Sequence, residues 1–441
     1  MKKIYLLTLT ALTSVALLKA QSPCATGRYA NNTFTNVTTT SSVVYGSNTK
    51  ANGSNQILTM DIYQPTGDIE TARPLIIWAH GGSFIGGTST DADVVSLSQA
   101  FAKKGYVCVS INYRLGLTPF DSTGAIKAVL RAVQDMKASV RFFYKDKLTT
   151  NTYKIDTNNI FIGGSSAGAI TALQYAYLDK SCEINYYVTP TNLAALGGME
   201  GYSGNQCYST KVKGVINLCG ALGRYGWLEP GDVPFCSMHG TADGTVKYNR
   251  GVVNPGIPLI LLDGSRMLKE QANAIGITNP FYTWYGQDHV PYANGTNPAA
   301  YMDTTIKFVR DFLISRLGCT DAALMPPNAP AQTATLYAYT TCTTNVASNC
   351  FVTGIIDGLN KNAIINDVYP NPSDNEITVA FTNSNTTHHI ELFDVTGKMI
   401  SSETTEQAAF KIKKNNISAG LYFLKITNKS GETITQKIIF K

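Results

Sequence analysis

Residues 159–168 read Asn159-Ile160-Phe161-Ile162-Gly163-Gly164-Ser165-Ser166-Ala167-Gly168. The apolar run that ends at Gly163 predicts a buried strand, and the pattern from Ala167 to Leu178 predicts a helix. Between them lies a G-x-S-x-G sequence, in which glycines on both sides allow a tight turn and a strained serine backbone. We therefore predict that Ser166 projects from this turn as a nucleophile. The alternative is a helix entry built from small residues.

The sequence on either side of this turn alternates between strand and helix patterns. Short apolar runs predict buried strands, and longer stretches with apolar residues three and four apart predict helices. Strands are expected at residues 59–63, 74–79, 106–111, 159–163, 212–218 and 234–238, and helices at residues 94–104, 125–144 and 167–178. This order predicts the α/β class: a mostly parallel sheet flanked by helices, with functional residues at the carboxyl ends of its strands.

A glycine-rich turn follows the expected strand at residues 74–79. Its sequence, His80-Gly81-Gly82-Ser83-Phe84, lets backbone amides face a substrate, where they can hold a developing oxyanion. We predict that the donors are the amides of Gly82, Ser83 and Ala167, the last of which follows the nucleophile. His80 is interpreted as a structural residue that fixes the loop. The alternative is an ordinary turn between a strand and a helix.

Two later sequences place an acid and a base after expected strands. Asp243 ends the sequence His239-Gly240-Thr241-Ala242-Asp243, and His289 ends Gly286-Gln287-Asp288-His289. Two of the five histidines lie near the C-terminus, and His80 and His239 have structural interpretations, so His289 is the predicted general base partly by elimination. Asp288 rivals Asp243 for the acid role, but a residue adjacent to a histidine rarely faces its ring. The order Ser166, Asp243, His289 is that of an α/β-hydrolase triad.

Residues 55–319 resemble bacterial carboxylesterases of the α/β-hydrolase fold. The matching sequences are, in order, residues 80–84, 111–115, 156–168 and 239–243, followed by His289. The resemblance implies a serine carboxylic-ester hydrolase, in which His289 activates Ser166 and an acyl-enzyme forms. It requires no cofactor and no metal, and no His, Cys and Asp cluster in the sequence has metal-ligand spacing. Ser83 stands where many relatives carry a third glycine, and its backbone donor is retained.

Residues 183–230 interrupt the alternation and are rich in tyrosine and tryptophan. Such an insertion forms either a partial cap over the site or a packed surface excursion, and both remain open. Aromatic side chains in a cap would suit polysaccharide-linked acyl or feruloyl esters, and polyesters are a further candidate substrate. Two alternative functions are a secreted serine peptidase of the same fold, which the sequence of residues 80–82 disfavours, and a non-catalytic adhesion protein, which the complete triad disfavours.

The N-terminus predicts export. Residues 1–20 combine Lys2 and Lys3 with an apolar stretch and end at Ala20, as a cleaved signal peptide does. The apolar stretch is too short and too interrupted by hydroxyl side chains for a membrane anchor, so we expect no integral membrane span after processing. The signal carries three lysines and no acidic residue. Its charge of +3 is half of the formal net charge of +6 of the chain. No basic run suggests nucleic acid as a partner.

The C-terminal part differs in composition from the rest of the chain. Residues 320–363 are rich in Ala, Thr, Asn and Pro, which predicts a linker between the hydrolase domain of residues 21–319 and the tail. In residues 364–441, short segments in which apolar and polar residues alternate recur every 10–15 positions. This pattern predicts several short strands and hence a small all-β sandwich. This tail resembles the C-terminal sorting domain of the bacterial type IX secretion system of the Bacteroidetes. The matching sequences are residues 368–373, 392–398, 417–424 and 437–441.

The resemblance of the tail implies a route of export. The protein would pass through the periplasm and then cross the outer membrane with the type IX secretion machinery as its partner, to be secreted or held at the cell surface. The sorting domain is then an address that is commonly removed afterwards. The alternative is a carbohydrate-binding or adhesive sandwich.

The chain has nine cysteines, an odd number. Cys108, Cys219 and Cys236 lie in or at the end of expected core strands and are interpreted as buried, unpaired residues. Export permits the other six to pair, and they allow 15 pairings. We predict the pairs Cys24–Cys319 at the two ends of the hydrolase domain, Cys182–Cys207 across the insertion and Cys342–Cys350 in the linker.

Overall fold

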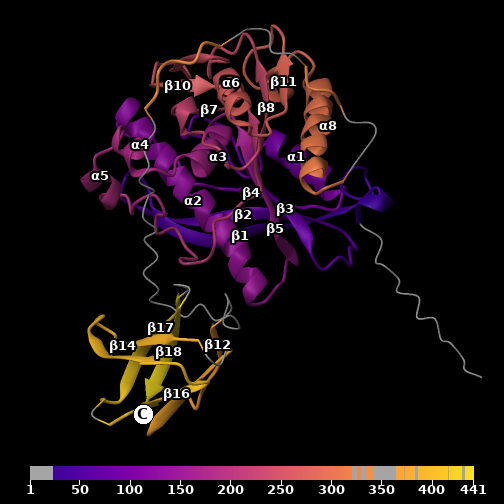
Figure 1. Cartoon of the computed structure of the whole chain (residues 1–441). Helices are drawn as coiled ribbons and strands as arrows, with labels where there is room; N and C mark the ends of the chain where they lie inside the picture. The colour runs from indigo at the N-terminus through magenta and orange to yellow at the C-terminus, as the bar shows by residue number, and fades with distance from the viewer. Residues whose placement is uncertain are drawn as a thin grey trace, which may run out of the picture.

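The computed structural model describes residues 23–319, 325–328, 334–340 and 364–441, with short gaps at 372, 383–385, 416 and 430–432. Residues 1–20, the predicted signal peptide, lie outside the described residues. Figure 1 shows a larger domain of sheet and helices and a smaller all-β domain formed by the C-terminal residues. In the described part of the chain, no helix is long and apolar enough to cross a membrane.

The larger domain is built on an eight-stranded sheet. In sheet order, its strands are β1 (Val37–Thr49), β2 (Asn55–Pro65), β4 (Val107–Ile111), β3 (Arg73–Ala79), β5 (Ile155–Ser165), β6 (Gly214–Leu218), β8 (Phe235–Gly240) and β11 (Phe281–Trp284). The pairs from β4 to β11 are parallel, whereas β1 with β2 and β2 with β4 are antiparallel. The predicted mostly parallel α/β sheet is therefore confirmed.

Helices cover this sheet, and the first three lie within a few residues of the helices predicted at 94–104, 125–144 and 167–178. They are α1 (Ala92–Ala102), α2 (Ser122–Leu148), α3 (Ala167–Tyr177), α4 (Ser181–Asn185), α5 (Pro190–Ala195), α6 (Ser265–Ile275), α7 (Pro291–Asn294) and α8 (Pro298–Arg316). The long helix α2 begins where the Asp121 side chain accepts a hydrogen bond from the amide of Gly124, which satisfies one of the unpaired donors of the first turn.

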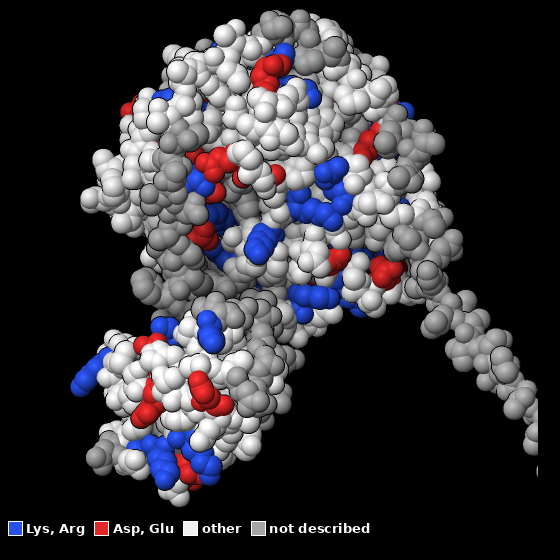
Figure 2. All heavy atoms as spheres, viewed as in Figure 1, with Lys and Arg blue, Asp and Glu red and all other residues white. Residues whose placement is uncertain are grey.

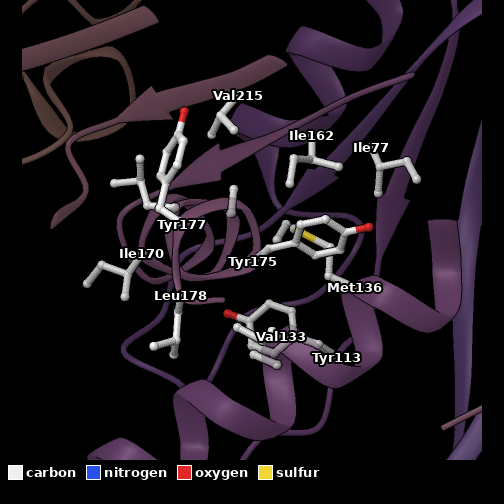
Figure 3. Packing of buried hydrophobic residues seen from close by; sticks show 14 of the residues in the cluster. Ile77, Tyr113, Val133, Met136, Ile162, Ile170, Tyr175, Tyr177, Leu178 and Val215 are labelled. Carbon is white, nitrogen blue, oxygen red and sulfur yellow. The ribbon is translucent and has the colours of Figure 1, made fainter. Parts of the chain in front are cut away.

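The core lies on both faces of the sheet because successive side chains of a strand point to opposite sides. In β3, Ile77 belongs to a cluster that includes Val133 and Met136 of α2. Its neighbour Trp78 belongs to a second cluster, which includes Phe101 of α1 and Phe312 of α8. Figure 3 shows Ile77, Ile162 and Val215 of the sheet facing the residues of α2 and α3. A strand buried on both faces must be apolar throughout, which explains the unbroken run of β3.

A second sheet in the larger domain was not apparent from the sequence. It has three antiparallel strands, β7 (Ala221–Leu222), β10 (Ile260–Gly264) and β9 (Arg250–Val253), in that order. These strands are two to five residues long, and too short for a clear alternation of apolar and polar residues. The single-turn helix η2 (Tyr225–Trp227) follows β7.

The predicted linker is partly packed against the larger domain. Asn328 exchanges two hydrogen bonds with the backbone of Thr283, and the Tyr337 hydroxyl donates to Asp263 at 2.7 Å. The Arg250 guanidinium lies 3.9 Å from the centre of the Tyr337 ring. Residues 325–328 and 334–340 thus belong to the surface of the domain, although their composition is that of a linker. The rest of residues 320–363 lies outside the described residues.

The Arg114–Asp135 ion pair lies inside the larger domain. Arg114 Nε lies 2.9 Å from Asp135 Oδ1, and the Arg114 amide donates to Asp135 Oδ2 at 2.7 Å. The Ser203 hydroxyl donates to the same carboxylate at 2.5 Å, which joins residue 203 of the insertion to α2. The Asp135 side chain is fully buried, so removal of its charge would leave a buried guanidinium without its partner.

We expect the Asp135→Ala variant to lose about 3–5 kcal/mol of unfolding free energy, the usual consequence of breaking a buried ion pair. Urea denaturation measures this change. Asp303→Ala is the matched control, because it removes the solvent-exposed ion pair with Lys307 and should cost at most about 1 kcal/mol. Equal losses in the two variants would contradict the assignment of Asp135 to the core.

The smaller domain consists of two antiparallel sheets. One has the order β12 (Ile365–Tyr369), β13 (Glu376–Phe381), β16 (Ala409–Lys413), and the other β15 (Met399–Thr405), β14 (His388–Asp394), β17 (Gly420–Asn428), β18 (Thr433–Phe440). Every second residue of β13 is buried, which is the alternation seen in the sequence. Leu392, Leu424 and Ile438 belong to the hydrophobic core of the smaller domain. The prediction of an all-β C-terminal domain is confirmed.

The described cysteines fall into the two predicted groups. Cys24 and Cys319 form a disulfide with their Cα atoms 5.3 Å apart, as predicted. Cys108, Cys219 and Cys236 are buried and free, also as predicted. Cys182 and Cys207 are each disulfide-bonded, whereas Cys342 and Cys350 lie outside the described residues. The pairings Cys182–Cys207 and Cys342–Cys350 stay predictions.

Charged side chains cover a minor part of the face that Figure 2 shows. Figure 2 shows acidic and basic side chains on both domains, separated by large uncharged areas. This agrees with the charged fraction of 15% in the sequence.

Candidate active site

Ser166 occupies a sharp turn between β5 and α3. Its φ of 55° and ψ of −115° lie outside the regions that a serine adopts without strain. A Cβ atom on either Gly164 or Gly168 would clash with the carbonyl oxygen of Ala79, so both flanking glycines are required by close packing against β3. The Ser166 amide donates to the carbonyl of Leu218 at 2.9 Å, which holds the turn against the adjacent strand.

The side chains of Ser166, His289 and Asp243 form a chain of two hydrogen bonds. The distance from His289 Nε2 to Ser166 Oγ is 2.7 Å, and the distance from His289 Nδ1 to Asp243 Oδ2 is also 2.7 Å. Ser166 follows β5, Asp243 follows β8 and His289 follows β11, so all three come from the carboxyl ends of parallel strands. This geometry allows His289 to take a proton from Ser166 while Asp243 holds the ring.

The Asp243 carboxylate is buried yet well supplied with donors. Its Oδ1 atom accepts hydrogen bonds from the amides of Thr245 and Val246 at 2.9 and 2.8 Å. Burial alone would raise the pKa of Asp243, but hydrogen bonds from His239 and His289 outweigh it and hold the pKa well below its usual range. The carboxylate therefore stays ionised at neutral pH. The stability that it contributes is present above the unfolded-state pKa and is lost as the pH falls through the folded-state pKa.

The side chain of Asp288, the alternative acid, binds backbone amides. Its Oδ1 atom accepts hydrogen bonds from the amides of Gly244 at 2.8 Å and His289 at 2.7 Å. These bonds join the loop after β8 to the loop after β11. The histidine ring receives its carboxylate contact from Asp243 instead.

The loop after β3 presents the predicted oxyanion donors. Gly82 and Ser83 have positive φ values of 99° and 55°, which turn the backbone sharply. In the described part of the chain, no carbonyl accepts a hydrogen bond from the amide of either residue. Ala167 occupies the first position of α3, where an amide has no partner within the helix. The three amides are thus free to bind an anionic oxygen.

His80 has the structural position expected of it. Its ring stacks on Tyr113 with the ring centres 4.3 Å apart, and its Nδ1 lies 2.7 Å from the carbonyl oxygen of Gly81. The Tyr113 hydroxyl donates to the carbonyl of His80 at 2.9 Å. Burial lowers the pKa of His80. These contacts fix the start of the oxyanion loop.

A cavity of about 590 Å³ opens at Ser166 and His289. Most of the side chains that line it are polar, and they come from the oxyanion loop, the start of α1, the loops after β8 and β9, and α7. The polar ones beyond the triad include Ser83, Asp91, Asp93, Thr245, Asn254 and Asn294.

None of the residues that line this cavity comes from the insertion 183–230. Within the insertion, Tyr187 packs edge-on against Trp227 with the ring centres 5.8 Å apart. Both line a separate apolar pocket between α2 and α3, while Tyr186 and Tyr202 are exposed. In the described residues, the insertion behaves as a packed surface excursion rather than as a cap over Ser166.

One group of metal-ligating side chains lies among the described residues. Cys219, Asp243 and His289 offer ligand atoms within 4.8 Å of one another. The Asp243 and His289 atoms are already hydrogen-bonded to each other, and burial raises the pKa of the Cys219 thiol. A metal there would have to break the Asp243–His289 hydrogen bond, so we assign no metal to this group.

Comparisons with known proteins agree with both resemblances. Residues 60–223 match the family model BD-FAE, and residues 367–441 match the model Secretion system C-terminal sorting domain. Carboxylesterase 3B of Mus musculus is 35% identical over 122 residues, which cover 26% of this chain and 20% of that protein. Gut esterase 1 of Caenorhabditis briggsae is 30% identical over 118 residues, with the same coverage. The chain spans about a fifth of the length of these relatives.

A comparison with solved structures found esterases as well. The apo form of Thermogutta terrifontis esterase 2 has a TM-score of 0.47 and 18% identity, and the match covers 64% of this chain and 95% of that chain. Residues 60–223 are thus similar to the BD-FAE model, and residues 367–441 to the model of a secretion system C-terminal sorting domain. The resemblances inferred from the sequence are thereby confirmed.

Proposed function

We propose that the protein is a secreted serine carboxylic-ester hydrolase. The observation that carries this proposal is the chain of two 2.7 Å hydrogen bonds from Asp243 through His289 to Ser166, at a strained turn. The carboxylesterase relatives support the same reaction class. No cofactor takes part in the proposed reaction.

The proposed reaction has two halves. His289 takes the proton of the Ser166 hydroxyl as Oγ attacks the ester carbonyl, and the amides of Gly82, Ser83 and Ala167 hold the oxyanion. Protonated His289 then gives this proton to the leaving alcohol, and Ser166 remains acylated. Water, activated by His289 in the same way, releases the acid and restores Ser166.

The proposed substrate is an ester with a polar, hydroxyl-rich part, such as an acyl or feruloyl group linked to a polysaccharide. Carboxylate, amide and hydroxyl side chains around the cavity support this choice, because they can hydrogen-bond to sugar hydroxyls. A polyester would present mainly apolar surface to the same side chains and is the less favoured substrate.

The sorting domain indicates type IX export to the cell surface or to the medium. We propose that the chain passes through the periplasm after loss of residues 1–20 and crosses the outer membrane with the type IX machinery as its partner. Mass spectrometry of the exported protein tests this: its N-terminus should be Gln21.

A fluorophosphonate probe should label the wild-type protein at a single residue, Ser166, because only a serine that is activated by a neighbouring base attacks phosphorus rapidly. Peptide mapping by mass spectrometry identifies the modified residue. Prior denaturation should abolish labelling, since it separates Ser166 from His289. An unlabelled folded protein would favour the non-catalytic adhesion function instead.

A substrate panel separates the esterase from the peptidase of the same fold. Acetylated xylan, a feruloyl ester, a triglyceride, a polyester and a dipeptide amide are compared at equal protein concentration. The proposal expects the highest kcat/KM on a polysaccharide-linked ester. Cleavage of the dipeptide amide alone would assign the site to a peptidase.

A further inference from the structure

A second histidine contacts the acid of the site. His239 lies at the end of β8, and its side chain is fully buried. Its Nε2 atom is 3.1 Å from Asp243 Oδ2, the same oxygen that lies 2.7 Å from His289 Nδ1. Two imidazole rings therefore share one carboxylate oxygen, one on the side of Ser166 and the other in the core.

We propose that His239 is a positioning residue, which donates a hydrogen bond to Asp243 and thereby sets both the orientation of this carboxylate and its hold on His289. The proposal rests on the function proposed above, since it concerns the same site. His239 touches neither Ser166 nor the cavity, so it acts only through Asp243.

The donors around Asp243 show why the orientation would depend on His239. A carboxylate has about four acceptor positions. Two are taken at Oδ1 by the amides of Thr245 and Val246, one at Oδ2 is taken by His289, and His239 Nε2 lies 3.1 Å from the same oxygen, within reach of the fourth. A carboxylate that faces four donors cannot rotate without losing a hydrogen bond in a buried site, where such a loss is costly.

The neighbours of His239 assign its proton. Its Nε2 faces two acceptors, the carbonyl oxygen of Val246 at 2.9 Å and Asp243 Oδ2, and so must carry hydrogen. Its Nδ1 lies 2.7 Å from the Ser265 hydroxyl, which also accepts a hydrogen bond from Asn217 Nδ2 at 2.9 Å. The Ser265 hydroxyl also faces the carbonyl oxygen of Gly220 at 3.2 Å. Because its contact with Nδ1 is the shorter of the two, we place the single proton of Ser265 on the side of Nδ1, which leaves the proton of His239 on Nε2.

A neutral donor suits this position better than a cation. A neutral His239 orients the carboxylate and leaves its negative charge available to the imidazolium that forms on His289. Among the described residues, the titratable groups around His239 and Asp243 include His289, the buried Cys219 thiol and Tyr292. Lys247 Nζ lies 3.5 Å from the carbonyl oxygen of Asp243, and the Asp288 carboxylate binds the amide of His289. The Tyr248 ring lies edge-on to His239 with the ring centres 5.7 Å apart. Burial raises the pKa of Asp243, and the contacts of His239 and His289 with its carboxylate lower it.

The proposal predicts a change in the pH profile. When the donor of His239 is removed, Oδ2 binds only His289, so the carboxylate attracts the imidazolium more strongly. The acid limb of the kcat/KM profile should then move to higher pH. At the same time the freed carboxylate positions His289 less well, and kcat should fall by about 10- to 100-fold.

Three variants test this with a soluble ester. His239→Phe keeps a flat ring but has no donor, and it should show both the lower kcat and the shifted acid limb. His239→Gln places an amide donor near the position of Nε2 and should restore most of the wild-type profile. Thr283→Val is the matched control: Thr283 pairs with His239 across the β8–β11 register, and this change removes its buried hydrogen bond with Tyr248 without touching Asp243.

The outcomes separate positioning from a merely structural role. If His239→Phe and Thr283→Val lose similar stability and neither moves the acid limb, His239 only supports the fold and the proposal is overturned. If His239→Phe fails to fold, histidine ¹⁵N NMR of the wild-type protein decides: a ring protonated on Nδ1 but not on Nε2 overturns the proposal. A wild-type protein that neither hydrolyses esters nor reacts with the fluorophosphonate refutes the proposed function, whereas this NMR measurement still tests the hydrogen bond.

Discussion

Replacement of Ser166 by alanine is expected to lower kcat for a short p-nitrophenyl ester by about 10⁴- to 10⁶-fold, because without Oγ no acyl-enzyme can form. The residual rate over water would come from the oxyanion donors and substrate binding, which the change leaves in place. Initial rates, measured with enough protein to detect the slow variant, give the ratio.

The control for Ser166→Ala is Ser98→Ala. Ser98 is a buried serine of α1 with no hydrogen-bond partner among the described residues, and it lies outside the cavity. Its removal should leave kcat within about twofold, since no contact of the triad is touched. Ester hydrolysis that survives in purified, folded Ser166→Ala would show that another residue is the nucleophile.

The Asp243→Asn variant should lose about 10⁴-fold in kcat with the fold retained. Asparagine still accepts the amide hydrogen bonds of Thr245 and Val246, but it cannot supply a negative charge to His289. Its amide group also favours the wrong tautomer of His289, in which Nε2 carries the proton and cannot receive one from Ser166. Steady-state kinetics at neutral pH measure the loss.

Asp288→Asn provides a close comparison, because Asp288 was the alternative acid and lies next to His289. The introduced asparagine would still accept the amide hydrogen bonds of Gly244 and His289 through its carbonyl oxygen. We therefore expect a loss of less than about tenfold, equivalent to about 1.4 kcal/mol. A larger loss in Asp288→Asn than in Asp243→Asn would reverse the assignment of the acid.

The parts of the fold that the sequence predicts are those with strong local signals. The turn at Ser166 is predictable because a strand, two glycines and a helix must follow one another there. Strands such as β3 are predictable because burial on both faces demands an unbroken apolar run. The tail is predictable because half-buried strands alternate, as β13 does.

The parts that the sequence did not predict depend on tertiary contacts. The strand β1 has a mostly exposed sequence of hydroxyl residues, and it exists because it pairs with β2. Residues 334–340 have the composition of a linker, and their burial depends on a surface formed by Arg250 and by Asp263, which lies 74 positions before Tyr337. The contact of His239 with Asp243 likewise depends on the conformation of the loop after β8, which a local pattern does not encode.

The disulfide between Cys24 and Cys319 has a mechanical consequence. During export, a pull on the C-terminal tail would first load the contacts of Tyr337 and Asn328 with the larger domain, and once these are lost it would reach the end of α8. Because Cys319 is bonded to Cys24, this load passes directly to the N-terminal segment, which is itself anchored by the Tyr29 and Phe34 amides on the carbonyls of Lys104 and Lys103. The helix α8 cannot be peeled from the sheet unless both ends of the domain detach together. The disulfide thus lets the contacts at both ends of the larger domain resist the same pulling force.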